Sequence, residues 1–192
     1  RDDANVYSWN DKTNSQLYTT DNYGVLSMSD NIKFATVYKG TPKIDGNEDP
    51  IWEFATQIKT ETPIQVSGTV YAAAYANVKL LWDETAIYVW ADVYDPLLNK
   101  DNANPWEQDS IEIFVDENNH KTPYYEDDDV QYRVNYENTQ TFGTNGSAQN
   151  FVTSTKITPF GYTVEAKVYM RTTTLSEGTV IGFDVQVNDA DH

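Results

Sequence analysis

The feature that most constrains this chain is the two-residue alternation of apolar and polar side chains in short segments. VKLLW (78–82) and AIYVWADVY (86–94) flank the three residues DET, and this spacing predicts a β-hairpin. The same alternation recurs in SIEIFVD (110–116), QYRVNYE (131–137), YTVEAKVYM (162–170) and TVIGFDVQVND (179–189). Because successive side chains of a strand point to opposite faces, each of these segments predicts a strand with one buried face.

The segments between the predicted strands are rich in Gly, Asn, Asp and Pro, as in residues 95–105 and 143–150, and no segment shows a helical period. Many short strands separated by turns are typical of an all-β sandwich of two antiparallel sheets. A chain of 192 residues is long enough to bury one sizeable core, and no low-complexity linker divides it. We therefore expect one domain over residues 1–192.

The alternation also predicts which side chains share a face. The core faces of three segments hold Ile111, Ile113, Val115, Tyr132, Val134, Tyr136, Phe183, Val185 and Val187. The opposite faces then present Glu112, Arg133, Asn135 and Gln186. If these strands lie in one sheet, those four polar side chains meet on one surface.

Two interpretations of that surface are open. A mixture of hydrogen-bond donors and acceptors suits the hydroxyl groups of a sugar. A solvated sheet face with a cross-strand ion pair between Glu112 and Arg133 explains the same residues. The residues alone favour the second interpretation.

The composition excludes several classes of function. A net charge of −17 disfavours nucleic acids and anionic membranes, whose phosphates require clustered Lys and Arg. The absence of cysteine excludes disulfides, thiolate metal sites and thiol catalysis. Only His120 and His192 are available for chemistry that needs an imidazole. No apolar stretch is long enough to span a membrane, and we expect no membrane partner.

Carboxylates are concentrated in four turn-rich segments: IDGNED (44–49), VYDP (93–96), YYEDDD (124–129) and VNDAD (187–191). None of them matches an EF-hand loop. Oxygen ligands in loops nevertheless suit Ca²⁺, and several such loops in a chain without disulfides predict structural calcium. The candidate ligands are Asp49, Asp95, Asp127, Asp129 and Asp189.

Trp106 lies in NPWEQDSIEIF, at the junction between a loop and a predicted strand. The chain also holds 14 tyrosines and 5 tryptophans. Strands favour aromatic residues in any case, but a tryptophan in a polar loop offers a flat apolar face to a partner.

Three segments of the chain resemble carbohydrate-binding module family 9, which occurs appended to xylanases. The resemblance runs through residues 80–147 (LLWDETAIYVW through TQTFGTNGS), through TVIGFDVQVNDA (179–190) and through GTPKIDGNEDPIW (40–52). It covers about residues 32–192 directly. It implies a jelly-roll-like sandwich of two antiparallel sheets that carries structural calcium.

The resemblance also implies a function. The family's module has no catalysis of its own and grips the reducing ends of cellulose or xylan chains between two aromatic rings. It also takes cello- and xylo-oligosaccharides and glucose. We therefore expect a secreted, extracellular and monomeric module, joined in the same polypeptide to a parent glycoside hydrolase.

Individual residues match the family's binding site. Trp106 matches one ring, and Glu112, Arg133, Asn135 and Gln186 match residues that hydrogen-bond the terminal sugar. The last four are the side chains that the alternation had already placed on one face.

The order of segments departs from the family. The second ring and a ligand-contacting Asn follow the VQVNDA strand in the family, whereas this chain carries a similar stretch in residues 1–30: SWND (8–11), Asn14, Tyr18 and NYGVL (22–26). A straight alignment from Trp9 places Leu17 at the position of the second ring, and one inserted residue places Tyr18 there. We assign the second ring to Tyr18, because leucine offers no flat face, and the amide to Asn14. The chain is then either a circular permutant joined through SMSDN (27–31) or a window across two tandem modules. A single domain that closes on itself predicts that Arg1 lies near His192 and that residues 5–10 pair with the main sheet.

Two other classes of function remain to be weighed. A glycoside hydrolase would use a pair of carboxylates, for which Glu107 and Glu112 are the obvious candidates. Five positions apart, they face opposite ways on a regular strand. A calcium-dependent adhesion module or a haem-binding sandwich is the third class, and haem would need axial ligands from the scattered Met28, Met170 and His120.

Overall fold

The computed structural model describes residues 18–20, 26–28, 33–60 and 74–190. Two short strands, β1 (Tyr18–Thr20) and β2 (Leu26–Met28), form an antiparallel pair of their own. Arg1, His192 and residues 5–10 lie outside the described residues, and so do the contacts expected of them. No helix among the described residues is long and apolar enough to cross a membrane.

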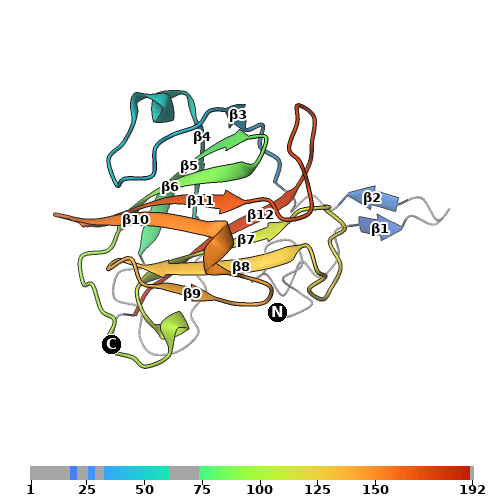
Figure 1. Ribbon diagram of the computed structural model, residues 1–192. Coiled ribbons are helices and arrows are strands. Elements are labelled where there is room, and N and C mark those ends of the chain that lie inside the picture. The colour runs from blue at the N-terminus through green and yellow to red at the C-terminus, as the bar shows by residue number, and fades with distance from the viewer. Residues whose placement is uncertain (1–17, 21–25, 29–32, 61–73, 191–192) are drawn as a thin grey trace.

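Most of the described strands form two sheets (Figure 1). The six-stranded sheet has the order β10-β11-β6-β5-β3, and β4 also pairs with β5. Its strands are β3 (Tyr38–Lys39), β4 (Thr56–Lys59), β5 (Tyr75–Asp83), β6 (Ala86–Tyr94), β10 (Phe151–Thr158) and β11 (Gly161–Tyr169). Strands β5 and β6 close on each other at Asp83 and Ala86, which confirms the predicted hairpin.

The second sheet has four antiparallel strands in the order β12-β7-β8-β9. They are β7 (Ser110–Asp116), β8 (Asp129–Asn135), β9 (Gln140–Phe142) and β12 (Gly182–Asn188). In Figure 1 the two sheets lie one above the other as the layers of a sandwich. The predicted all-β fold of two sheets is confirmed.

The core lies between the two layers. Ile111, Ile113 and Val115 are completely buried and belong to one apolar cluster with Val89 and Val164 of the other sheet. Phe183, Val185 and Val187 are half-buried and pack against the same cluster. The Tyr132 and Phe151 rings stack across the layers, with ring centroids 4.7 Å apart. The faces predicted from the alternation in β7, β8 and β12 are therefore confirmed.

A separate segment covers part of the outer face of the six-stranded sheet. It contains the short 3₁₀ turn η2 (Pro50–Phe54), whose Trp52 is completely buried against Trp90 of β6. The carboxylate of Glu165 on β11 accepts hydrogen bonds from the backbone N–H groups of Asp45 and Gly46 and from Trp52 Nε1. This buried carboxylate ties the covering segment to the sheet.

Candidate functional site

The outer face of the four-stranded sheet carries a row of polar side chains. The strand register places Gln186 beside Glu112, Glu112 beside Arg133, and Arg133 beside Thr141. These four residues therefore cross β12, β7, β8 and β9 in one line. The sequence predicted the first three members of this row.

Glu112 is the centre of the row. Its Oε1 atom accepts from Arg133 Nε at 2.5 Å and from Asn188 Nδ2 at 2.8 Å, and its Oε2 atom accepts from Gln131 Nε2 at 2.6 Å. Glu112 is 3% exposed and Arg133 is 7% exposed. A buried charge pair is costly unless its remaining hydrogen bonds are also made, and here the surrounding amides make them.

The amides beside the pair extend the network. Gln186 Nε2 donates to Asn188 Oδ1 at 2.6 Å, and Arg133 Nη1 donates to Thr141 Oγ1 at 3.0 Å. Asn135 Nδ2 donates to Gln108 Oε1 at 3.2 Å. Ser110 joins that bond to the rest, because its Oγ atom donates to Gln108 O and accepts from Asn188 Nδ2. All four polar residues predicted for this face are thus in one connected group.

Sequence reasoning missed Gln108 and Thr141. Gln131 and Asn188 lie two positions from Arg133 and Gln186 on the same strands, and the two-residue period turns them to the same polar face. They were not, however, predicted as residues of the site.

Trp106 lies at the edge of this polar face. It belongs to the 3₁₀ turn η3 (Pro105–Glu107), its side chain is 57% exposed, and its ring centroid is 6.0 Å from Arg133 Cζ. A ring packed in the core would be covered, so the structure supports an exposed role for this tryptophan. Trp106 and the Glu112–Arg133 pair therefore share one surface.

The loop that holds Trp106 is fixed at its base by Asp109, which is completely buried. Asp109 accepts from Asn99 N at 2.5 Å and from Ala190 N at 2.6 Å. Burial raises the pKa of Asp109 to about 7, and the charge of Asp95 also raises it. The backbone hydrogen bonds from Asn99 and Ala190 lower the pKa but do not outweigh burial. These bonds join the Trp106 loop to the end of β12.

The two residues expected to complete the site come from the start of the chain. Tyr18 begins β1, but its side chain is outside what the structure describes. Asn14 lies outside the described residues altogether. Their opposition to Trp106 stays a prediction.

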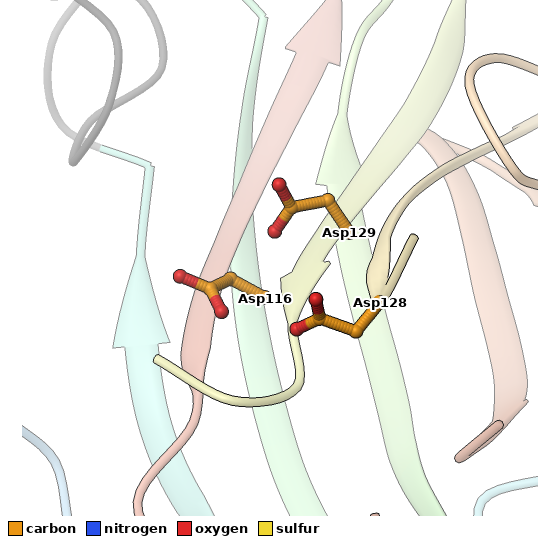
Figure 2. A group of neighbouring side chains, drawn as sticks. All are labelled: Asp116, Asp128 and Asp129. Carbon is orange, nitrogen blue, oxygen red and sulfur yellow. The ribbon is translucent and has the colours of Figure 1, made fainter. Parts of the chain in front are cut away.

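A group of three carboxylates lies elsewhere on the same sheet. Asp116 ends β7, Asp129 begins β8, and Asp128 precedes it; one oxygen from each lies within 4.8 Å of the other two. Figure 2 shows the three side chains converging. All three residues are buried.

The chemistry of this group fits a hard cation. Asp116 is 4% exposed, and its Oδ1 atom is buried without a hydrogen-bond partner. Backbone N–H groups donate to all three carboxylates: from Lys121 to Asp116 Oδ2, from Asn118 to Asp128 and from Glu126 to Asp129. Three adjacent buried carboxylates repel one another unless a cation or protons neutralise them. Oxygen ligands of this kind suit Ca²⁺.

Only one of the five predicted calcium ligands, Asp129, belongs to the three-carboxylate group. Asp95 lies beside Asp109, Asp49 accepts from Lys43 N at 2.7 Å, and Asp189 accepts from Ala74 N at 2.7 Å. Asp127 is next in sequence to the group, and its backbone carbonyl accepts from Arg171. The segment YYEDDD (124–129) contains Asp128 as well as Asp129, but Asp128 was not among the predicted ligands. Asp116 was also missed, and the strand register places it beside Asp129.

Comparison with known proteins finds relatives that are named as xylanases and as an exoglucanase. Endo-1,4-beta-xylanase A of Thermotoga maritima is 55% identical over 189 residues, which is 98% of this chain and 18% of that protein. Exoglucanase XynX of Acetivibrio thermocellus is 49% identical over 186 residues, covering 97% of this chain and 17% of that protein. The chain thus spans less than a fifth of the length of these curated relatives. Because the matches run through nearly the whole chain, its order of segments is also found in those relatives.

The chain is also similar to solved structures of a carbohydrate-binding module. A carbohydrate binding module family 9 from Caldicellulosiruptor kristjanssonii in complex with cellotriose is 42% identical, with a TM-score of 0.70, and the match covers 81% of this chain and 76% of that chain. A complex of a module described in the same words with glucose gives the same TM-score and identity. The model of the family described as "Carbohydrate family 9 binding domain-like" matches residues 44–192. With its two-sheet sandwich and its polar face beside an exposed tryptophan, this chain belongs to the carbohydrate family 9 of binding domains, a family of non-catalytic modules.

Proposed function

We propose that this module binds the reducing ends of cellulose and xylan chains, and the corresponding oligosaccharides and glucose, at the outer face of its four-stranded sheet. The observation that carries the proposal is the exposed ring of Trp106 beside the buried Glu112–Arg133 pair. A sugar has apolar C–H faces and polar hydroxyl edges, and this surface offers a partner for each. The family neighbours of known structure are complexes with cellotriose and glucose.

The polar partners are ordered before any sugar arrives. Glu112 holds the guanidinium of Arg133 in place, and Gln131 and Asn188 fix the carboxylate in turn. A site whose side chains are already ordered loses less conformational entropy on binding. Charge-assisted hydrogen bonds to sugar hydroxyls are about twice as strong as neutral ones, so Glu112 and Arg133 are the main polar determinants.

In this proposal the sugar lies between two rings. Trp106 stacks on one C–H face, and Tyr18 stacks on the other. Asn14, Asn135 and Gln186 complete the hydrogen bonds to the ring hydroxyls. A slot closed beyond the terminal sugar accepts a chain end and excludes the interior of a chain, which accounts for reducing-end preference.

The paired-carboxylate alternative has less support. Both oxygens of Glu112 accept hydrogen bonds from neighbouring side chains, so neither is poised to protonate a leaving group. Glu107 accepts from Asn104 Nδ2 at 2.8 Å in the exposed η3 turn. We therefore propose that catalysis is supplied by a glycoside hydrolase in the same polypeptide, as the xylanase relatives suggest, and that the protein acts outside the cell as a monomer.

We further propose that Asp116, Asp128 and Asp129 hold a structural Ca²⁺. The support is the buried, unpartnered Oδ1 of Asp116, which belongs to this group of three buried carboxylates. When bound, the ion neutralises this cluster at the shared end of β7 and β8. The two strands that carry Glu112 and Arg133 are then joined at that end.

Isothermal titration of the protein with cellotriose, xylotriose and their borohydride-reduced forms tests the function. We expect both native sugars to bind and the reduced sugars, which lack a closed terminal ring, to bind much more weakly. Equal affinity for native and reduced sugars would refute the reducing-end slot but leave sugar binding intact. No heat with either native sugar would refute the function itself.

A further inference from the structure

The structure points to a second sugar-contacting site on the opposite side of the sandwich, on the outer face of the six-stranded sheet. It consists of an aromatic group formed by Tyr75, Tyr94 and Phe160, and of the polar side chains Asn77 and Asp92. We propose that this site, hereafter the second site, binds the interior of a neutral β-linked glucan or xylan chain. The surface with Trp106 and the Glu112–Arg133 pair, hereafter the first site, lies on the four-stranded sheet and shares no residue with the second site.

The register defines the second site as two adjacent rows. Tyr75 pairs with Tyr94, and Tyr94 pairs with Gly161 at the tip of the β10–β11 hairpin. Two residues further along the strands, Asn77 pairs with Asp92. The rows thus place aromatic and polar side chains side by side on one face. A pocket of about 400 Å³ lies there, lined mainly by Tyr75, Tyr94, Phe160, Asn77, Asp92 and Thr158.

Among the described residues, the covering segment contacts a neighbouring part of the same face. It packs Trp52 on Trp90, and Trp52 Nε1 donates to Glu165, which pairs with Trp90 in the register. Asp92 and Tyr94 come next along β6, and Tyr94 is 40% exposed. The pocket therefore lies beside these contacts on the outer face of the sheet.

The backbone that carries Phe160, the most exposed ring of the second site, is fixed by close contacts with β6. Phe160 is 68% exposed, although its backbone carbonyl accepts from Asp95 N at 2.8 Å. Next to it, Gly161 has a φ of +149°, and a Cβ atom there would lie 2.1 Å from the carbonyl oxygen of Val93. Only glycine permits this close approach. The backbone of the hairpin tip is thus fixed against β6, and the Phe160 ring that it carries is exposed to solvent.

The other two rings that line the pocket are those of Tyr75 and Tyr94. Tyr75 and Tyr94 stack with centroids 5.3 Å apart and planes at 20°. Lys59 Nζ lies 4.4 Å from the centroid of Tyr75. Tyr75 therefore contacts both Tyr94 and Lys59, whereas Phe160 and Tyr94 are the more exposed rings among the described residues of this site and are the ones that we expect a ligand to contact.

The chemistry of the lining selects a neutral sugar. Aromatic faces pack on sugar C–H groups, and the side chains of Asn77, Asp92 and Thr158 supply acceptors and donors for hydroxyls. A net charge of −17 and the carboxylate of Asp92 disfavour an anionic ligand. The first site has the same composition, an exposed ring beside amides and a carboxylate. A module with two such faces contacts a polysaccharide at two places.

The test separates the second site from the first by removing Trp106. Cellohexaose and xylohexaose are titrated into Trp106→Ala, Trp106→Ala/Phe160→Ala and Trp106→Ala/Phe54→Ala, and binding is followed by NMR line positions. Phe54 is the matched control because it is 70% exposed on the covering segment, outside the second site. We expect weak residual binding in Trp106→Ala, retention with Phe54→Ala, and a loss of about tenfold or more with Phe160→Ala.

Several outcomes overturn the second site. One is the absence of residual binding in Trp106→Ala, and another is equal residual binding in Trp106→Ala and Trp106→Ala/Phe160→Ala. A Phe160→Ala variant that lowers only the melting temperature shows a packing role instead. In the wild-type protein, cellohexaose should also shift the backbone amide signals of residues 92–94 and of Thr158, Phe160 and Gly161. Unchanged positions of these signals would refute the second site without any variant.

The same experiments keep the two proposals apart. If Trp106→Ala binds cellobiose as tightly as the wild type, the first site is wrong, whatever Phe160 does. Borohydride reduction should leave the residual binding in Trp106→Ala unchanged, because the second site takes the interior of a chain. The cellohexaose and xylohexaose arms show which polysaccharide supplies the ligand.

Discussion

Arg133 Nε donates to Glu112 Oε1 at 2.5 Å, and the two residues are direct partners across β7 and β8. Both side chains are more than nine-tenths buried although they lie on the outer face of the sheet. The pair is therefore both a structural element of the sheet and the polar centre of the binding face. Loss of one partner leaves a buried charge without its counterion.

We expect Glu112→Ala and Arg133→Ala each to lower the free energy of unfolding by about 3–5 kcal/mol, because removing one member leaves the charge of the other buried and unpaired. The double variant should lose less than the sum of the two single variants. Urea denaturation of all four proteins measures this coupling. Strict additivity would show that the two side chains do not stabilise each other.

Trp106→Ala should abolish measurable binding of cellobiose and leave the fold intact. The ring is 57% exposed, so its removal uncovers little core, whereas a stacked ring at the centre of a site contributes on the order of 2 kcal/mol or more, about 30-fold in affinity. Titration calorimetry and thermal denaturation give the two readouts. Phe54→Ala serves as the control, and a loss of affinity in that variant as well would point to a general effect.

Tyr18→Ala should weaken cellobiose binding about as much as Trp106→Ala does, because each ring stacks on one face of the same sugar. Leu17→Ala should leave the affinity nearly unchanged, since an aliphatic side chain offers no flat face. Calorimetry on the two variants distinguishes these neighbours. A larger loss of affinity in Leu17→Ala than in Tyr18→Ala would assign the contact opposite Trp106 to Leu17.

Removal of divalent cations should lower the melting temperature, and Ca²⁺ should restore it. The cause is the repulsion among Asp116, Asp128 and Asp129 once no cation neutralises them. Thermal denaturation with EDTA and then with excess Ca²⁺ measures the shift. In Asp116→Asn the response to Ca²⁺ from this group should largely disappear, and in the control Glu177→Gln it should persist.

Stability at acid pH should depend on Asp83, which closes the β5–β6 hairpin. Burial alone would raise its pKa, but hydrogen bonds from Tyr88 Oη and from Thr85 outweigh burial and lower the pKa to about 2. A lowered pKa in the folded state stabilises the protein above the ordinary value of 3.8, and this contribution is lost as the pH falls towards 2.

Because Asp83 is only half-buried and solvent screens part of its interactions, we expect a contribution of about 1 kcal/mol at neutral pH. Asp83→Asn should therefore be about that much less stable than the wild type at pH 7 and equal to it near pH 2. Denaturant titrations at pH 7, 4 and 2 test this, and a difference that stays constant with pH would contradict it.

Much of the fold could be predicted because its signal is local. The two-residue period of residues 110–116 and 131–137 is a direct consequence of a sheet with one buried face, and it placed Glu112 and Arg133 on the same surface. The pairing of Asp116 with Asp129 is different, because it depends on a register between strands joined by a long loop. No local pattern specifies that register, and so Asp116 was missed.

The covering segment shows a second limit. Glu165 lies in an alternating strand and has the polar, outward position of a solvated residue, yet it is 1% exposed. It is buried because Trp52 and the backbone of Gly46 fold back onto the sheet from more than a hundred positions away. A contact of that separation leaves no trace in the neighbourhood of residue 165.

The bond from Asn188 Nδ2 to Glu112 Oε1 joins residues 76 positions apart. The β12–β7 pairing that makes it is therefore among the more distant closures in the sandwich, and such closures are slow because the entropy of a long loop is lost before any contact is gained. A nascent chain that has not yet released β12 from the ribosome lacks one side of the sugar site. Sugar binding at the proposed site therefore requires that both synthesis and folding have reached β12.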